Sequence, residues 1–225
     1  MKPLVSVIIP VYNGAKFLKD AIANVKSQNY HPLEIIIVDD GSTDETAIIA
    51  QSFGEQIIYI YQENKKAASA RNKGLKIAKG ELMAFLDVDD LWSENKLNQQ
   101  VKYLETNTDI EVVTGLLQRV VIDENKQILE EFDEKSLTVS CSTALYRKYV
   151  FEKVGYFDEV LKQNEDTDLF MRLRENNIKI GIIEEILLYY RRHKTNTTLN
   201  QDENMRFMLK SLQKSIQRRR NYEAK

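Results

Sequence analysis

Asp87, Asp89 and Asp90 follow directly on an apolar run at residues 82–86. Like charges this close repel one another, and burying them is costly unless a positive group neutralises them. Carboxylate oxygens are hard ligands that suit Mg²⁺ or Mn²⁺, and such sites commonly take one or two protein carboxylates and then substrate phosphates. Solvated acids at a capped helix start are an equally good explanation. The triplet alone leaves both alternatives open.

Other polar side chains follow the ends of further apolar runs. Asp39 and Asp40 end one run, and Tyr12 follows the first. Arg71 lies in the segment before the aspartate triplet. Each has an ordinary explanation: acids can enter a turn, a tyrosine can pack, and an arginine can snorkel on a helix surface. Arginine also binds phosphate oxygens, and an aromatic ring offers a flat surface to a base. Together these residues indicate a site for a nucleotide and a metal.

The elements that must position these side chains alternate between strands and helices. Short apolar runs rich in Val and Ile are typical of strands buried on both faces of a parallel sheet, and they occur at residues 4–10, 33–38, 57–60 and 82–86. The βαβαβαβ order predicts an α/β fold, a doubly wound sheet with right-handed crossovers. In such sheets ligands bind outside the carboxyl ends of the strands, where the polar residues fall.

Helices are expected between these strands. Asn13 can cap a helix over residues 15–27, and a capping box at residues 42–45 opens a helix that ends near residue 54. A third helix is expected over residues 67–78, and Ser93 caps a fourth.

The second half of the chain is less regular. Strands are predicted at residues 111–115, 119–122, 138–146, 178–183 and 186–190, with a turn at 123–126. Helices are predicted up to residue 154, over 166–176 and over 202–219. The last helix has an apolar stripe of Met205, Met208, Leu209, Leu212 and Ile216. No linker splits the chain, so residues 1–225 are expected to form one domain with a first half (1–110), a second half (111–195) and a C-terminal amphipathic helix (200–220).

Five ordered motifs carry a resemblance to a known family. They are VSVIIPVYNG at 5–14, IVDDGSTD at 37–44, ARNKG at 70–74, FLDVDD at 85–90 and NEDTDL at 164–169. The chain resembles the family 2 glycosyltransferases, which have the GT-A fold, a Rossmann-like and mostly parallel sheet with a smaller acceptor side. The resemblance covers residue 4 to about residue 193, and it implies that residues 1–110 are the nucleotide-sugar-binding half and residues 111–195 the acceptor and catalytic half.

The resemblance implies a role for each matched residue on the donor side. Pro10, Tyr12 and Asp40 are expected to contact the nucleotide base. Arg71 is expected near the base or the diphosphate, and Asp87 near the ribose.

The same resemblance implies the reaction centre. Asp89, in a DXD motif, is expected to bind Mn²⁺ or Mg²⁺ on the donor diphosphate, and Asp90 to support the loop. His193 is weighed as a further metal or diphosphate contact against an exposed histidine in a basic loop. Asp166 is expected to be the general base, with Glu165 orienting it or the acceptor.

The implied reaction transfers a sugar, from a nucleotide-diphosphate donor that we expect to carry UDP, to an acceptor hydroxyl with inversion. A carboxylate can take the hydroxyl proton during attack, and a metal can stabilise the departing diphosphate. A metal-dependent nucleotidyltransferase and a non-catalytic nucleotide-binding module are the alternatives. The first needs a Gly-rich phosphate loop, which residues 10–14 do not supply, and the second leaves Glu165 and Asp166 unexplained.

Two positions depart from the pattern or stay ambiguous. The loop at residues 62–69 lacks the glycine that family members often have, which restricts positive φ there. Trp92 either faces the acceptor or packs at a helix start.

Composition limits the partners and the compartment. The formal net charge of −2 gives no general attraction to nucleic acid. Cys141 is the only cysteine, is expected to pack in a strand, and points to a reducing, cytoplasmic setting. The expected partners are a nucleotide sugar and a glycan, lipid-linked or other hydroxyl acceptor, as in polysaccharide biosynthesis for the cell envelope. Peripheral contact with the inner face of the membrane and a homodimer through the last helix are further alternatives. For residues 218–220 we favour charges at a helix end over a membrane anchor.

Overall fold

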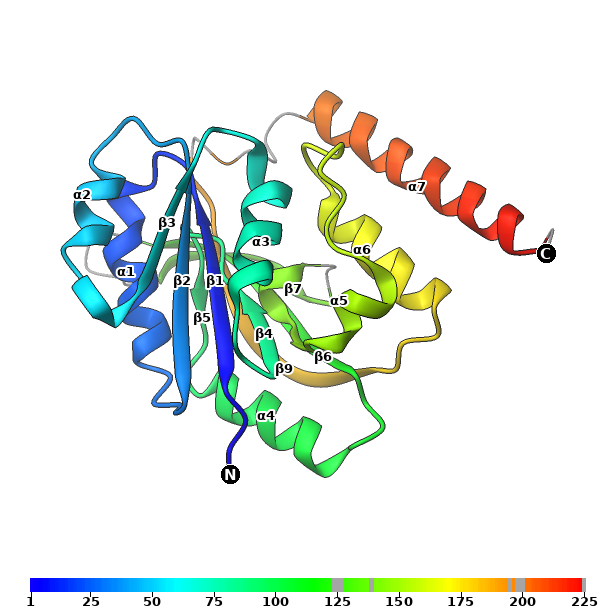
Figure 1. Cartoon of the computed structure of the whole chain (residues 1–225), viewed down its shortest axis with the longest axis horizontal. Coiled ribbons are helices and arrows are strands. Elements are labelled where there is room, and N and C mark those ends of the chain that lie inside the picture. The colour runs from blue at the N-terminus through cyan, green and yellow to red at the C-terminus, as the bar shows by residue number, and fades with distance from the viewer. Residues whose placement is uncertain (123–127, 138–139, 194–195, 197–200, 224–225) are drawn as a thin grey trace.

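The computed structural model describes residues 1–122, 128–137, 140–193, 196 and 201–223 (Figure 1). Its first half alternates strands and helices. These elements are β1 Val5–Val11, α1 Ala15–Lys26, β2 Leu33–Asp40, α2 Thr46–Gln51, β3 Ile58–Gln62, α3 Lys66–Ile77 and β4 Leu82–Phe85. The four expected strands and the helices between them are therefore confirmed.

The second half mixes strand directions. Its elements are β5 Leu91–Trp92, α4 Lys96–Thr106, β6 Val112–Ile122, β7 Ile128–Ser136, β8 Leu145–Arg147, α5 Tyr149–Val154, α6 Glu165–Glu175, β9 Ile180–Arg191 and α7 Gln201–Glu223. Two short 3₁₀ turns, η1 Gly54–Gln56 and η2 Cys141–Thr143, complete the described part.

All described strands belong to one sheet with the order β3-β2-β1-β4-β8-β6-β9-β5, and β7 pairs with β6. The strands β3, β2, β1 and β4 are mutually parallel, β8 is antiparallel to β4 and to β6, and β9 runs parallel to β6. Because β8 reverses the direction twice, β4, β6 and β9 all point the same way. The carboxyl ends of the two halves therefore meet at one edge of the sheet, the upper edge in Figure 1.

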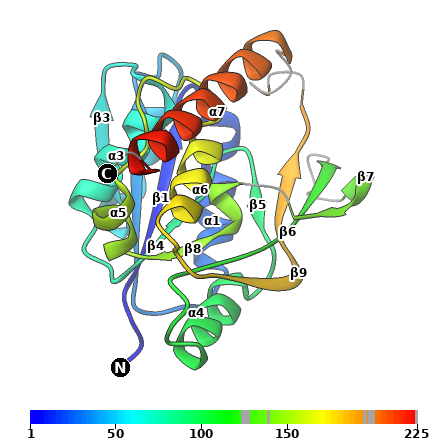
Figure 2. The same ribbon diagram turned by 90° about the vertical axis from the view of Figure 1, so that its right-hand side faces the viewer.

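Apolar side chains fill a core on each face of the sheet. One core joins β1 and β2 to α1, α2 and α4 through residues such as Leu18, Ala50 and Leu97. The other joins the opposite face to α3, α5 and α6 through residues such as Leu75 and Phe151. Figure 2 shows α7 lying outside α6, further from the sheet. The layers thus hold the carboxyl edge rigid between two packed faces.

Several local expectations are wrong, and each has a physical reason. Residues 140–144 form η2 with a short β8 after it, because the Ser140 side chain caps the turn by accepting from the Ser142 amide at 3.2 Å. Cys141 is buried but lies in that turn and not in a strand. The predicted strands at 178–183 and 186–190 are one strand, β9, whose bulge against β6 absorbs the polar residues between them.

The expected caps are also displaced. Gly14 and Asn95 take the N-cap positions of α1 and α4 in place of Asn13 and Ser93. Asp44 accepts hydrogen bonds from the Thr46 amide and hydroxyl, so α2 begins at Thr46, later than the capping box indicated. The turn predicted at 123–126 lies outside the described residues. The division of the chain into halves stays a prediction.

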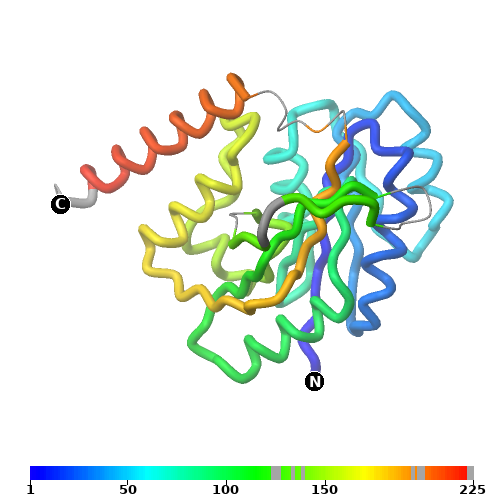
Figure 3. Tube along the Cα trace, turned by 180° about the vertical axis from the view of Figure 1, so that it is seen from behind, coloured from blue at the N-terminus to red at the C-terminus, as the bar shows by residue number. Residues whose placement is uncertain are grey.

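No helix in the described part of the chain combines the length and apolar character needed to cross a bilayer. Figure 3, seen from behind, shows the long helix α7 running outward from the body of the protein.

Candidate active site at the carboxyl edge of the sheet

The loops after β1 and β2 hold each other in place at this edge. The Asn13 amide donates to Ser42 Oγ at 2.9 Å, and the Thr43 amide donates to Asn13 Oδ1 at 2.7 Å. Gly41 has φ +81°, and a Cβ there would lie 2.8 Å from the Asn64 nitrogen. Only glycine allows this close approach to the backbone of Asn64 in the loop after β3. The loops after β1, β2 and β3 therefore form one surface.

Asp39 and Asp40 use their carboxylates inside this surface. Asp40 accepts hydrogen bonds from Gln62 Nε2 at 2.7 Å and from the Lys65 and Lys66 amides at 2.8 Å each. Asp39 accepts from the Ser42 amide and from the Tyr59 hydroxyl, at 2.8 Å each. Both side chains are buried. Asp40 therefore stabilises the conformation of the loop before α3.

In the loop at residues 62–69, which lacks glycine, a lysine adopts a positive φ. Lys66 has φ +73°, a left-handed conformation that costs a non-glycine residue roughly 1–2 kcal/mol. The Asp40 hydrogen bond to the Lys66 amide helps to hold this conformation. The Lys66 ammonium lies 6.0 Å from the centre of the Tyr12 ring. Tyr12 is 52% exposed, whereas Pro10 is buried in β1 beside Val38 of β2. Tyr12 therefore presents an exposed ring on this surface.

Arg71 joins the two halves of the site. Its guanidinium pairs with Asp87 at 2.5 Å and with Glu165 at the start of α6, and its side chain is 5% exposed. Burial disfavours the charged guanidinium, but Asp87 and Glu165 raise the pKa of Arg71 well above its ordinary value. Ser142 of η2 lies 3.3 Å from the other Asp87 oxygen. Surface snorkelling of Arg71 is thus wrong, since the residue is a buried bridge between two carboxylates.

Asp166 lies beside this bridge without a cation of its own. It accepts a hydrogen bond from the Thr167 amide at 2.7 Å, and it forms no ion pair with any described residue. Burial, and then the negative charge of Glu165, raise the pKa of Asp166 to about 7. A carboxyl with such a pKa exchanges protons near neutral pH, which is what a general base needs.

Asp89 meets His193 at the end of β9. His193 Nε2 lies 2.9 Å from Asp89 Oδ2, and the Arg191 guanidinium donates to the Asp89 carbonyl oxygen. Asp90 is buried and accepts from the Arg191 amide at 3.0 Å. Burial, with Asp89 next, raises the pKa of Asp90. The expected loop-supporting role of Asp90 agrees with this contact, and the chain itself supplies positive groups beside the aspartate triplet.

Sequence reasoning missed three contributors to this corner. The Phe17 ring of α1 lies 5.0 Å from the His193 ring, centre to centre. The Arg191 guanidinium lies 4.9 Å from the centre of the Phe17 ring. The Asn196 side chain contacts His193 Nε2 at 3.1 Å and the Arg191 carbonyl oxygen at 3.1 Å. Ser142, which contacts Asp87, is the third. The basic run 191–193 was a usable signal for β9, but nothing in the sequence marks Phe17 or Ser142.

Trp92 does not face the site. It is 2% exposed, and its indole Nε1 donates to the Ser142 carbonyl at 3.0 Å. The buried Lys96 ammonium lies 4.1 Å from the centre of the Trp92 ring. The packing interpretation of Trp92 is the correct one.

The donor atoms around Asp89 fit a cation that is completed by its substrate. No three His, Cys, Asp or Glu side chains converge on a metal position within the described ranges. Asp89 and His193 supply one carboxylate and one imidazole, and Mg²⁺-type sites commonly take one or two protein ligands with phosphate and water as the rest. Arg191 Nη2 is buried and has no hydrogen-bond partner among the described atoms. An N–H left in this way fits an arriving phosphate oxygen.

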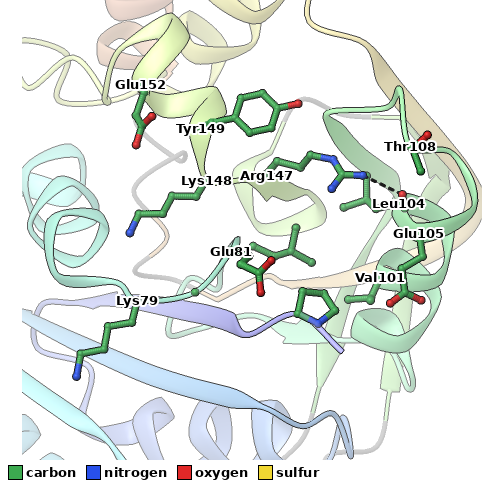
Figure 4. A pocket seen from close by; sticks show the side chains of 13 residues that line it. Lys79, Glu81, Val101, Leu104, Glu105, Thr108, Arg147, Lys148, Tyr149 and Glu152 are labelled. Atoms are coloured by element: carbon green, nitrogen blue, oxygen red, sulfur yellow. Dashed lines mark hydrogen bonds between the residues drawn. The ribbon is translucent and has the colours of Figure 1, made fainter. Parts of the chain in front are cut away.

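A separate cleft of about 580 Å³ opens at the opposite edge of the sheet (Figure 4). Side chains of both charges line it, among them Lys79, Glu81, Lys148 and Glu152. The Arg147 guanidinium at this edge already donates to the carbonyl oxygens of Leu104 and Ile110. None of the residues that line the cleft belongs to the five motifs of the sequence analysis. The carboxyl edge remains the candidate active site.

The sequence of the chain decides the family. The family model described as "Glycosyl transferase family 2" matches residues 6–155. The chain belongs to glycosyl transferase family 2. An uncharacterized glycosyltransferase of Rickettsia typhi is 38% identical over 223 residues, which span 89% of this chain and 69% of the relative. The chain is thus a glycosyltransferase.

Solved structures show the same fold. S. aureus TarS (residues 1–349), in a complex with UDP-GlcNAc, has a TM-score of 0.73 at 24% identity, and the match covers 89% of this chain and 61% of TarS. A mannosyltransferase from Pyrobaculum calidifontis, in a complex with GDP-Man and Mn²⁺, has a TM-score of 0.77 at 19% identity over 96% of this chain and 65% of that one. This glycosyltransferase therefore has the GT-A fold and spans less than two thirds of either protein.

The family match covers only part of the site. Residues 6–155 include Asp40, Arg71 and Asp89, but they end before Glu165 and Asp166. The glycosyltransferase brings the two parts together through Arg71, which contacts Glu165 from α3.

Proposed function

We propose that this chain is an inverting glycosyltransferase that moves a sugar from a nucleotide-diphosphate sugar, with UDP as the expected nucleotide, to an acceptor hydroxyl. The observation that carries the proposal is the placement of Asp166, whose pKa is raised to about 7, beside the Arg71 bridge at the carboxyl edge of the sheet. Asp166 is the proposed general base. Inversion needs a base on one side of the sugar and a stabilised leaving group on the other, and no covalent intermediate.

The acceptor hydroxyl is a poor nucleophile at neutral pH, so its proton must leave during the attack. Asp166 in its ionised form takes that proton as the new glycosidic bond forms and the bond from the sugar to the diphosphate breaks. Glu165 contributes in two ways. Its ion pair with Arg71 fixes the first turn of α6, and its charge helps to raise the pKa of Asp166.

The donor side of the proposal rests on Asp89 and its surroundings. Asp89 and His193 would hold Mn²⁺ or Mg²⁺, and such an ion stabilises the negative charge that develops on a departing diphosphate. Arg191 Nη2 supplies a buried N–H toward the same diphosphate. Asp89 Oδ2 and His193 Nε2 lie 2.9 Å apart, a separation that suits two neighbouring ligands of one octahedral ion, which would replace their mutual hydrogen bond.

The nucleotide itself is proposed to lie on the loops after β1 and β2. Tyr12 offers its exposed ring to the base, with Pro10 beneath the loop. Asp40 frames the base site by holding the Lys65 and Lys66 amides, and Asp87 faces the ribose while Arg71 holds it. Asp87 and Arg71 thus connect the donor site to Glu165 and to the proposed general base Asp166.

A nucleotide-binding experiment tests the donor site without knowledge of the acceptor. UDP with Mn²⁺ is expected to raise the melting temperature, and Asp89→Asn is expected to abolish most of that rise, because it removes the carboxylate charge at the metal position. Asp109→Asn is the matched control, since Asp109 is an exposed aspartate whose partner is Lys179 at 3.1 Å. A full UDP and Mn²⁺ response in Asp89→Asn would remove Asp89 from the metal site.

The sugar and the acceptor need a separate measurement. The two solved relatives named above were bound to UDP-GlcNAc and to GDP-Man, both of them nucleotide-diphosphate sugars. A thermal-shift panel of UDP, GDP and other nucleotide sugars with Mn²⁺ is expected to give its largest shift with a UDP-sugar. A larger shift with a GDP-sugar would correct the nucleotide and leave the transferase proposal in place.

A further inference from the structure

The helix α7 packs on the protein mainly through a polar face and not through the apolar stripe noted in its sequence. The buried residues of the helix are Phe207, Ser211 and Ser215, which face α6. The apolar stripe faces outward instead. Its exposed fractions are 57% for Met205, 44% for Met208, 52% for Leu209 and 43% for Ile216, and the fifth member, Leu212, is half-buried.

Ion pairs and hydrogen bonds fix the helix in this orientation. Arg218 donates to Asp168 Oδ1 at 2.9 Å and to Glu175 Oε2 at 2.6 Å, and Lys214 pairs with Asp158. Ser215 donates to the other Glu175 oxygen at 2.6 Å. These contacts engage the polar side of α7 along its length. The outward orientation of the apolar stripe is therefore built in.

Basic side chains accompany the stripe. Residues 204–222 contain six lysines and arginines and no acid, although the whole chain has a net charge of −2. Lys214 and Arg218 are used by the ion pairs with α6 and its neighbours. The remaining four, which no ion pair engages within the described ranges, are Arg206, Lys210, Arg219 and Arg220. An apolar stripe flanked by cations is typical of a helix that lies in the interface of an anionic membrane.

We propose that the outer face of α7 docks on an anionic lipid surface, with the apolar stripe among the acyl chains and the four cations at the headgroups. A second copy of the chain fits this face less well. A two-fold contact places the same patch of both subunits together, so basic residues would meet basic residues over 204–222. An anionic lipid surface complements the same charges.

The position of α7 links this surface to the reaction centre. Asn164, the residue before Glu165 and Asp166, donates to the Asn204 carbonyl oxygen of α7 at 3.0 Å. The amino end of α7 lies at the upper edge in Figure 1, the edge to which β1 and β2 point. Docking through α7 would thus present Asp166 to an acceptor carried by a lipid. This part rests on the proposed function, whereas the docking itself does not.

Co-sedimentation of the full chain with vesicles tests the docking directly. Binding is expected to vesicles of phosphatidylglycerol and phosphatidylcholine in equal parts, and much less to phosphatidylcholine alone. Arg219→Gln with Arg220→Gln is expected to weaken the partition about 30-fold, the effect of two cations near an anionic surface at about 1 kcal/mol each. Leu209→Glu with Ile216→Glu is expected to abolish it, because acids cannot enter the acyl region.

Matched variants elsewhere separate a specific surface from general adhesion. Ile48→Glu changes an apolar residue that is 70% exposed on α2, and Lys19→Gln with Lys76→Gln removes two exposed cations from α1 and α3. Both controls are expected to bind vesicles as the unchanged chain does. Equal binding by all variants, or no binding by any, would overturn the proposal. So would a dimer in sedimentation velocity that Leu209→Glu dissociates. Vesicle binding needs no donor, metal or acceptor, so its outcome is independent of whether transfer is detected.

Discussion

Asp40 and Asp166 lie at the same edge of the same sheet, but the protein treats their charges in opposite ways. Asp40 accepts three hydrogen bonds from a loop that it holds in shape, and Asp87 and Glu165 share the buried cation of Arg71. Asp166 receives only the Thr167 amide from the described residues, and its pKa is raised to about 7. Asp40, Asp87 and Glu165, whose charges are compensated, hold the site in shape, whereas Asp166 has no cation of its own in the described part of the chain and is available to take a proton.

The largest expected effect of this difference is on the rate. Asp166→Asn keeps the shape of the side chain and removes its basicity, so transfer should fall by roughly 10²–10⁴-fold. Nucleotide binding, measured by the UDP and Mn²⁺ thermal shift, should be retained. Asp109→Asn serves again as the control and should transfer normally. Full transfer by Asp166→Asn would assign the base to another group.

The next effect is on stability. Arg71→Met removes the cation between Asp87 and Glu165 and leaves a buried Glu165 carboxylate and a partly exposed Asp87 carboxylate without a cationic partner, so the free energy of unfolding should fall by about 4 kcal/mol. Urea denaturation measures the loss. Arg147→Met, at the opposite edge of the sheet, removes an arginine that donates to two carbonyl groups and pairs with no described acid, and should cost less. Equal losses would mean that the ion pairs of Arg71 with Asp87 and Glu165 stabilise the protein no more than the neutral contacts of Arg147.

A smaller stability loss should separate Asp40 from Asp89. Asp40→Asn replaces a charged acceptor of three hydrogen bonds, two of them from backbone amides, and should cost about 3 kcal/mol of unfolding free energy. Asp89→Asn, in a partly exposed pair with His193, should cost less than about 1 kcal/mol. Denaturation of both variants in the same buffer checks this. A larger loss for Asp89→Asn would place Asp89 among the acids that build the site.

The sequence predicted the parallel half of the fold and the residues of the site, because both leave local signals. Buried parallel strands are apolar at every position, and polar residues at their carboxyl ends must lie together at one edge. Asp40, Arg71, Asp87, Asp89, Glu165 and Asp166 all lie at that edge in the structure. The roles of these residues in catalysis and binding stay predictions.

Partners within the site could not be predicted in the same way. Arg71 was expected near the base or the diphosphate, and its pairing with two acids distant in sequence was not predicted. The left-handed lysine at 66 depends on Asp40, and the outward stripe of α7 depends on ion pairs with α6. Such choices are made by tertiary contacts, which outweigh local propensity and helical periodicity.

The pH dependence of stability follows from the raised pKa of Asp166, with a defined sign. Burial and Glu165 raise this pKa from 3.8 to about 7, so between those values the folded protein keeps a proton that the unfolded chain has lost. The stabilisation from this proton is complete below about pH 4 and disappears as the pH rises through about 7. Asp109 has the opposite sign, because its hydrogen bond to Lys179 lowers its pKa.

The central claim is that Asp166 has no cation of its own among the described residues and keeps a raised pKa, and one measurement tests it without any substrate. The difference in unfolding free energy between Asp166→Asn and the unchanged chain should be followed from pH 4 to pH 8 by urea denaturation. We expect the variant to gain about 4 kcal/mol over this range, with the gain levelling off near pH 7. A difference that does not change with pH, or that falls as the pH rises, would show that the charge of Asp166 is compensated and would contradict the account.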